Sequence, residues 1–182
     1  MTRILAIGAS SSVKSINRTL AGYVAGLINE SEVTFVDLND FEMPIYSIDK
    51  EKEGGIPQQA IAFKRLIEIH DGVVLSLAEH NGTYSSAFKN VLDWSSRLQG
   101  PLWANTPMFL LSTSPGKRGG ATVMQLALNY LPYMKAQIVA HFSVPSFGLN
   151  YSEEHGLVNS EIYQDFEVQL KAFQKALEGD SK

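Results

Sequence analysis

The alternation of short apolar runs with helical segments is the sequence feature that most constrains how this chain can fold. Near-continuous apolar runs typical of buried strands occupy residues 4–7, 33–36, 72–77, 107–111 and 136–142. Between them, apolar side chains recur three and four positions apart, as in Ile16, Leu20 and Val24, and this spacing indicates helices. We expect helices over residues 15–28, 57–70, 84–94, 121–134 and 162–177, and a polar loop over residues 38–56.

This pattern predicts an α/β fold. Strands that are apolar along their whole length are usually covered on both faces, so the sheet should be parallel, with helices on either side. At 182 residues the chain suits a single domain spanning residues 1–182. We therefore expect a doubly wound five-stranded parallel sheet of order 2-1-3-4-5, in a three-layer α/β/α arrangement. Ligands of such sheets bind beyond the carboxyl ends of the strands, which directs attention to three loops.

The composition excludes several kinds of chemistry. The chain has no cysteine, which rules out disulfides, thiolate catalysis and cysteine-ligated metals, and its four histidines show no metal-ligand spacing. A net charge of −4 leaves no broad basic face for nucleic acid. No run of eighteen apolar residues could cross a membrane, and the N-terminal residues lack the pattern of a signal peptide. We expect a cytoplasmic protein without a metal site.

The loop after the first strand, residues 8–18, is rich in small hydroxyl residues and leads directly into a helix. Helix N-termini favour anions, and the hydroxyls of Ser10, Ser12 and Ser15 and the amide of Asn17 are possible donors to a phosphate. The loop has neither the Gly-x-Gly-x-x-Gly pattern nor the Gly-x-x-x-x-Gly-Lys-Ser/Thr pattern, so a monophosphate fits better than a pyrophosphate. The alternative is a serine-rich helix cap that binds no ligand.

The loop after the third strand carries Asn81, Gly82 and Thr83, followed by Tyr84. Gly82 permits a tight backbone path, and exposed backbone N–H groups in such a turn can face a flat heterocycle and stabilise negative charge on it. The ring of Tyr84 is a candidate to cover one side of that ligand. The alternative is ordinary turn chemistry, the usual cause of such Gly/Asn clusters.

The loop after the fourth strand, residues 112–120, combines a proline with three glycines and allows close backbone approach. Lys117 and Arg118 add local positive charge, which suits a phosphorylated second substrate. Ordinary turn chemistry is again the alternative. The placement of three such loops at strand ends of one sheet favours a ligand site more strongly than any one loop.

These residues resemble those of the NAD(P)H-dependent FMN reductase family, which has a flavodoxin-like fold and includes chromate, azo-dye and quinone reductases. The first loop shares Ser10, Ser15 and Asn17 with the family motif Gly-Ser-x-Arg-x-x-Ser-x-Asn, but has Ala9 in place of glycine and Ser12 in place of arginine. The second loop and its helix, residues 79–84 and 88–94, match more closely the family's Pro-Glu-Tyr-Asn-Gly-Ser/Thr-Tyr and Leu-Lys-Asn-x-x-Asp-Trp, with Ala78 in place of proline and His80 in place of tyrosine. The stretches 37–46 and 114–120 also resemble family loops.

The resemblance implies a bound FMN that takes a hydride from NADPH or NADH and passes electrons to a flavin, a quinone or another small acceptor. It implies a homodimer or higher homo-oligomer, for which the apolar segment 94–103 is a candidate contact. It requires no side chain as a catalytic acid or base, and Glu79 is expected to order its loop or bond the flavin edge. The implied cofactor-binding residues are Ser10, Ser12, Ser15, Ile16, Asn17, Glu79, His80, Asn81, Gly82, Thr83, Ser114, Pro115, Gly116, Gly119 and Gly120.

Two other functions stay open at this point. A flavodoxin-like electron carrier would bind FMN without using a pyridine nucleotide, but the first loop lacks the Thr-x-Thr-Gly-x-Thr pattern of such carriers. A non-redox binding module would have kept the fold and lost the cofactor, for which the replacement of the family arginine by Ser12 leaves room.

Overall fold

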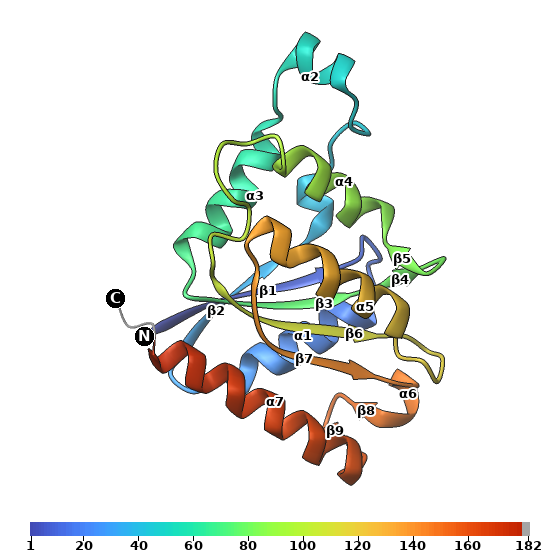
Figure 1. Cartoon of the computed structure of the whole chain (residues 1–182). Helices are drawn as coiled ribbons and strands as arrows, with labels where there is room; N and C mark the ends of the chain where they lie inside the picture. The colour runs from blue at the N-terminus through green and yellow to red at the C-terminus, as the bar shows by residue number, and fades with distance from the viewer. Residues whose placement is uncertain (180–182) are drawn as a thin grey trace.

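The computed structural model describes residues 1–179 and has a five-stranded parallel sheet at its centre (Figure 1). Its order is β2-β1-β3-β6-β7, which confirms the predicted doubly wound arrangement. The strands of this sheet are β1 (Thr2–Ala9), β2 (Ser31–Val36), β3 (Gly72–Leu77), β6 (Pro107–Thr113) and β7 (Gln137–Val144). The flavodoxin-like prediction therefore holds for the whole sheet.

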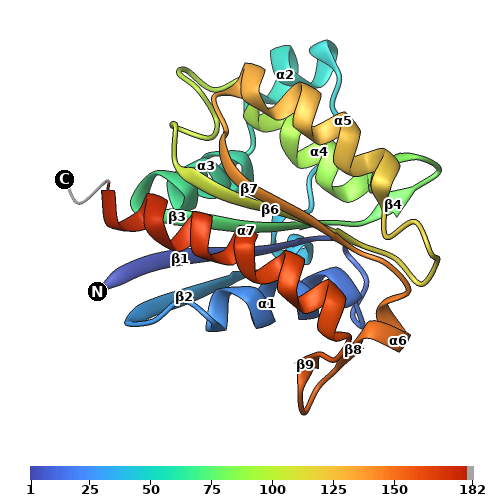
Figure 2. The same ribbon diagram turned by 60° about the horizontal axis from the view of Figure 1, so that its bottom comes forward.

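Helices cover both faces of the sheet. They are α1 (Ile16–Gly26), α3 (Gln58–Ile69), α4 (Ser86–Ser95), α5 (Ala121–Tyr130) and α7 (Ser160–Gly179). Figures 1 and 2 show α1 and α7 on one face and α3, α4 and α5 on the other. Each face has its own buried apolar cluster, and Leu5 and Ile7 point into one while Ile4 and Ala6 point into the other. This alternation is why the buried part of the first strand, residues 4–9, has no polar side chain.

Several short elements were not predicted from the sequence. The stretch expected to be a loop over residues 38–56 contains the 3-10 helix η1 (Leu38–Phe41) and the helix α2 (Ile48–Gly54), which stands away from the sheet in Figure 1. No residue of α2 is buried, so it has no apolar stripe from which a helix could be recognised. The others are the hairpin β4 (Glu79–His80) and β5 (Thr83–Tyr84), α6 (Phe147–Asn150), β8 (Tyr151–Ser152) and β9 (Gly156–Leu157). The helix expected over residues 121–134 is divided into α5 and the 3-10 helix η2 (Leu131–Met134).

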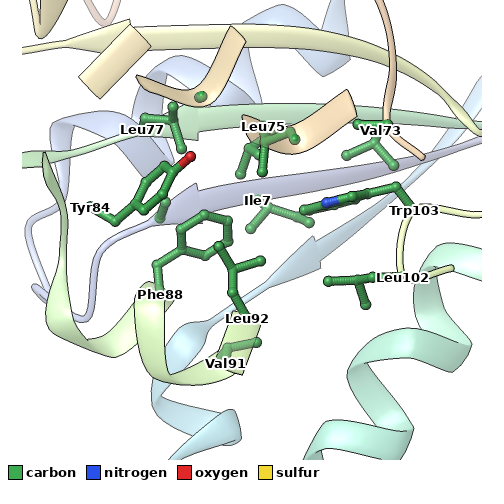
Figure 3. Packing of buried hydrophobic residues seen from close by; sticks show 14 of the residues in the cluster. Ile7, Val73, Leu75, Leu77, Tyr84, Phe88, Val91, Leu92, Leu102 and Trp103 are labelled. Carbon is green, nitrogen blue, oxygen red and sulfur yellow. The ribbon is translucent and has the colours of Figure 1, made fainter. Parts of the chain in front are cut away.

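Aromatic residues that the sequence suggested for the surface lie in the core. Tyr84 is 5% exposed and packs edge-on against Phe88, on the same face as Leu77 and Leu92 (Figure 3). Burial raises the pKa of the Tyr84 hydroxyl to about 12. The expectation that this ring covers a bound ligand is therefore wrong, because the ring already fills the space between the sheet and its helices.

The segment 94–103, expected to contact a second subunit, has its largest apolar side chains in the core. Trp94 and Leu102 are buried, and Trp103 is completely enclosed beside Ile7 and Val73 (Figure 3). These three side chains pack within the subunit, whereas residues 96, 97 and 99–101 of the segment are exposed, and the expected contact with a second subunit stays a prediction. No helix within residues 1–179 is long and apolar enough to cross a membrane.

Candidate functional site

The loops singled out in the sequence meet at one edge of the sheet. Residues 10–15, the β4–β5 hairpin and residues 114–120 follow the carboxyl ends of β1, β3 and β6, which are adjacent strands (Figure 1). The amino terminus of the chain lies at the opposite edge. The strand order thus assembles one loop cluster from three distant stretches of sequence, as expected for a doubly wound sheet.

The first loop is held tightly against the start of α1. A Cβ atom on Gly8 would lie 2.5 Å from the Cα atom of Arg18, so only glycine fits there. The Ser15 hydroxyl accepts a hydrogen bond of 3.1 Å from the Arg18 backbone N–H and caps the helix, as the alternative reading of the loop expected. Ser10 Oγ accepts from the Ser12 backbone N–H at 3.2 Å. The Ser12 side chain is exposed, and its hydroxyl has no partner within residues 1–179.

Side chains that follow the neighbouring strand β2 brace this loop, a feature that sequence reasoning missed. Arg18 Nη1 lies 2.7 Å from Asp37 Oδ2. Asn39 donates from its side chain to the Ser11 carbonyl at 3.3 Å, and its backbone N–H bonds to Asp37 Oδ1. The backbone N–H of Asn39 is the main reason that the pKa of Asp37 lies below its ordinary value. The Asp-Leu-Asn sequence directly after the second strand was the available signal.

Asn17 does not lie on the surface of the loop. It is 3% exposed, and its side chain bonds to β3 and β6 underneath the helix start. Its Nδ2 donates to the Thr113 carbonyl, while its Oδ1 accepts from the Thr113 backbone N–H and from the Ser76 hydroxyl. The amide is thus bonded inside the protein.

The second loop is a two-residue hairpin. Asn81 and Gly82 have φ angles of 51° and 79°, and this pair of left-handed residues is the preferred hairpin turn for an Asn-Gly sequence. Glu79, directly before the turn, accepts hydrogen bonds of 2.9 and 3.0 Å from the backbone N–H groups of Thr122 and Val123. These N–H groups form the N-terminus of α5, where a carboxylate is favoured. Glu79 therefore orders its loop, as the sequence suggested, by joining the hairpin to α5 through these two hydrogen bonds.

The rest of this hairpin faces solvent. His80, Asn81 and Thr83 are exposed, and their side chains form no hydrogen bond with other residues in the described part of the chain. Together with the backbone of Gly82 they provide polar groups that a ligand can reach.

The third loop is fixed by its backbone. The Ser112 hydroxyl donates to the Gly119 carbonyl at 2.8 Å, and the backbone N–H groups of Ser146 and Phe147 donate to the carbonyls of Gly116 and Ser114. At Gly119, whose φ is +56°, a Cβ atom would lie 2.8 Å from the backbone of the strand β7. The close approach predicted for this loop is thus made to another part of the protein.

Other residues of this third loop remain accessible at the edge. Pro115, Gly116, Lys117 and Arg118 are exposed, and Gly120, with φ of +78°, caps α5. Arg118 Nη2 bonds to the Thr122 hydroxyl at 2.7 Å, whereas the Lys117 ammonium has no partner within residues 1–179. The loop therefore offers accessible backbone beside two cations.

The donors at this edge suit a ligand with one phosphate and a planar polar ring. The phosphate end would find exposed hydroxyls and the N-terminus of α1, an 11-residue helix, with the exposed Lys14 nearby in the sequence. The ring would find turn backbone of the hairpin and of residues 114–120. Residues 1–179 contain no group of three or more His, Cys, Asp or Glu side chains that could hold a metal ion.

Comparison with known proteins agrees with this geometry. A 2-hydroxy-1,4-benzoquinone reductase from a Burkholderia species is 33% identical over 121 residues, which cover 65% of this chain and 64% of that protein. An NADPH:quinone oxidoreductase from Arabidopsis thaliana is 27% identical over 194 residues, covering 98% of this chain and 95% of its own length. Among solved structures, the flavoenzyme NAD(P)H:(acceptor) oxidoreductase FerB from Paracoccus denitrificans superposes with a TM-score of 0.77 at 22% identity, covering 98% of each chain.

The family match extends over most of the molecule. The family model described as NADPH-dependent FMN reductase matches residues 2–148, which include all five strands of the sheet and all three loops of the candidate site. The resemblance noted in the sequence is thereby confirmed, and the chain belongs to the NADPH-dependent FMN reductase family.

Proposed function

We propose that the protein is an FMN-dependent NAD(P)H oxidoreductase that delivers electrons to a flavin, a quinone or another small acceptor. The observation that carries this proposal is the assembly of three polar loops at one sheet edge, in a chain whose residues 2–148 match the FMN reductase family. Bound FMN supplies the redox chemistry by accepting a hydride from NADPH or NADH, and the protein supplies binding and orientation. The quinone-reductase names of the relatives support a quinone as one acceptor.

The first loop would hold the phosphate. Ser10 and Ser12 offer hydroxyls at the surface of the loop or close to it, and Ile16 offers backbone at the start of α1. Ser15 caps the helix by accepting a hydrogen bond, which leaves its own hydroxyl proton free to donate to an anion. Lys14 is exposed and would supply part of the charge that the family arginine supplies. Because an ammonium cannot form the bidentate contact of a guanidinium, we expect weaker phosphate binding than in relatives with that arginine.

The second and third loops would hold the ring. The backbone of Asn81, Gly82 and Thr83, and of residues 114–120, would donate to the ring edge and stabilise negative charge that develops on reduction. His80 is exposed on the hairpin and is a candidate to bond or stack against the ring. Neither loop presents a side chain that must act as a catalytic acid or base, since the hydride moves between the nicotinamide and the flavin.

The phosphorylated hydride donor would approach the exposed cations at the third loop. Lys117 and Arg118 lie beside the proposed ring site and form no ion pair with a carboxylate in the described part of the chain. In a protein of net charge −4 they form a local positive region that attracts a nucleotide phosphate.

We further propose that residues 1–182 act as a single domain, that the protein is cytoplasmic, and that it forms a homodimer or higher homo-oligomer. Exposed apolar side chains near α2, with Ile45 80% and Ile48 47% exposed, would contribute to a subunit contact, as would the exposed residues of the segment 94–103. Sedimentation showing only monomer at working concentration would contradict the oligomer.

The visible spectrum of the purified protein tests the main proposal. We expect a flavin absorption band that bleaches when NADPH or NADH is added without oxygen and returns when a quinone is added. Steady-state oxidation of NADPH with a quinone separates the enzyme from an electron carrier. A colourless protein with no calorimetric affinity for added FMN would instead support a non-redox binding module.

A further inference from the structure

We propose that Asn17 is a positioning residue that fixes the spacing between the first and third loops, and that it does not bind the phosphate. This inference rests on the proposed FMN site. Asn17 belongs to the phosphate motif of the family by sequence, so a direct contact is the expectation that the structure replaces. The evidence is the direction, the burial and the partners of its side chain.

The side chain pairs with the backbone of another strand. Asn17 Nδ2 lies 3.3 Å from the Thr113 carbonyl oxygen, and the Thr113 backbone nitrogen lies 3.2 Å from Asn17 Oδ1. The amide therefore binds both backbone groups of one residue, much as a neighbouring strand would. The Ser76 hydroxyl donates to the same Oδ1 at 2.8 Å. Two donors thus occupy this oxygen, which a carbonyl-type oxygen with two lone pairs can accept.

All three partners are shielded from water. Asn17 is 3% exposed, Ser76 0% and Thr113 1%. Water cannot replace a lost bond here without entering the junction of α1 with the sheet. Loss of the Asn17 amide would therefore leave buried polar groups unpaired, which is costly. Thr113 cannot move easily, since it is held by its own strand and by the bond from its hydroxyl to the Val144 carbonyl. The start of α1 would therefore be the side that moves to relieve this cost.

The position of this cluster links the two ends of the proposed cofactor. Asn17 is in the first turn of α1, directly after the loop that would hold the phosphate. Thr113 is the last residue of β6 and directly precedes Ser114, where the loop at the ring end begins. A single FMN must satisfy both ends at once, so its affinity depends on their spacing. Asn17 sets that spacing through β3 and β6.

Riboflavin reports on the ring end alone, because it has the ring of FMN and lacks the phosphate. The experiment is a titration of apoprotein with FMN and with riboflavin, monitored by quenching of flavin fluorescence. For Asn17→Ala we expect the dissociation constant of FMN to rise by about tenfold and that of riboflavin to change by less than about twofold, because riboflavin need not satisfy both ends. Ser76→Ala separates the two possible roles, because Ser76 is buried on β3 and acts only through its bond to Asn17. For this variant we expect a smaller rise for FMN and no change for riboflavin.

The double variant tests whether the two residues act together. If Asn17 acts through this cluster, the effects of Asn17→Ala and Ser76→Ala on flavin affinity are less than additive. The matched control is Asn129→Ala on α5, since Asn129 is exposed and bonds only to Gln125 across one helical turn at 3.4 Å. It should change neither dissociation constant.

The contrary results are distinct. Weaker FMN binding by Asn17→Ala with unchanged FMN binding by Ser76→Ala would make Asn17 a phosphate ligand and overturn the inference. A lower melting temperature with both affinities unchanged would reduce its role to stability alone and also overturn it. If Asn17→Ala does not fold, Ser76→Ala carries the same comparison of the two flavins. Wild-type protein that binds neither flavin would refute the proposed function itself, and this inference with it.

Discussion

The two ends of the parallel sheet differ in their side-chain bonds to backbone, although each also has an exposed ion pair, Arg18–Asp37 at the carboxyl end and Arg3–Asp71 at the amino end. At the carboxyl end, side chains bond to backbone groups of neighbouring elements: Asn17 to Thr113, Ser85 to the Ala9 carbonyl and Glu79 to the start of α5. At the amino end, Arg3 and Asp71 form an ion pair of 3.0 Å whose side chains are 51% and 44% exposed. The hydrogen bonds at the carboxyl end thus form a frame that holds the loops in place, whereas an exposed ion pair closes the amino end.

This difference indicates where function lies. Hydrogen bonds from these side chains to backbone groups have defined directions and tolerate little movement, so they fix the geometry of the loops. An exposed ion pair is weak and adaptable. Substitutions at the carboxyl end should therefore change flavin binding in addition to stability, and substitutions at the amino end should change stability alone.

The largest effect should come from Gly119→Ala, which breaks the frame. Gly119 has a φ of +56°, and its added Cβ would lie 2.8 Å from backbone atoms of Val144. The left-handed conformation and the clash together should cost about 2–3 kcal/mol of stability. The third loop can relieve the clash only by moving away from Val144, so FMN affinity should fall by more than about tenfold. Thermal denaturation and a flavin titration measure the two effects.

Gly26→Ala is the control for that change. Gly26 is in the last turn of α1, and nothing lies within 4 Å of its added Cβ. Alanine is a better helix former than glycine, so stability should stay the same or rise by up to about 1 kcal/mol. FMN affinity unchanged in both glycine variants would show that the third loop does not contact the flavin.

A smaller effect is expected when the hydrogen bonds from Glu79 to the start of α5 are removed. Glu79→Ala leaves the backbone N–H groups of Thr122 and Val123 without their acceptor, at a cost of about 1–2 kcal/mol. The hairpin then moves relative to α5, and FMN affinity should fall several-fold. Glu79→Gln keeps an acceptor oxygen and should recover most of the affinity. Equal losses in the two variants would mean that the charge of Glu79, rather than its position, is what flavin binding requires.

Ser12→Arg is expected to strengthen FMN binding without changing the frame at the carboxyl end. The Ser12 side chain is exposed and unpartnered within residues 1–179, so arginine can be placed there without disturbing the frame. Because a guanidinium can bond a phosphate with two N–H groups, FMN should bind about tenfold more tightly. Riboflavin affinity and stability should not change. Equal tightening of FMN and riboflavin would place the phosphate away from this loop.

Sequence reasoning predicted the fold because the signals for it are local and repeated. Each buried strand is recognisable in the sequence as a continuous apolar run, and the strand order follows from the handedness of the crossovers. The helix α2 gave no such signal, since it buries none of its residues. The β4–β5 hairpin was recognised only as a tight turn, because each of its strands has two residues.

The site was predicted by position better than by the direction of its side chains. The loops follow the strand ends, and Glu79 orders its hairpin as expected. Whether an aromatic or amide side chain near a strand end points outward or inward is set by packing, which a pattern of residue types does not contain. Tyr84 and Trp103 therefore looked available for a ligand or a partner, and both are buried. Asn17 looked like a surface donor and points beneath the helix.

The smallest effect is expected at the amino end, for Asp71→Asn. The bond from the Arg3 guanidinium is the main reason that the pKa of Asp71 is lowered, with a further contribution from the Arg3 backbone N–H. A carboxyl group whose pKa is lower in the folded state stabilises the protein above its unfolded pKa, and this stabilisation is lost as the pH falls through the folded pKa.

The difference in urea midpoint between wild type and Asp71→Asn should therefore be small at about pH 7 and should shrink as the pH falls below about 3.9, the ordinary pKa of an aspartate. Asp165→Asn is the control, since Asp165 is exposed on α7 and pairs with no cation in the described part of the chain. Flavin affinity should be unchanged in both variants, because Arg3 and Asp71 lie at the starts of β1 and β3, at the opposite end of these strands from the loops. Weaker FMN binding by Asp71→Asn would contradict the division of the sheet into a functional end and a closing end, since it would show that the amino end also determines the loop geometry.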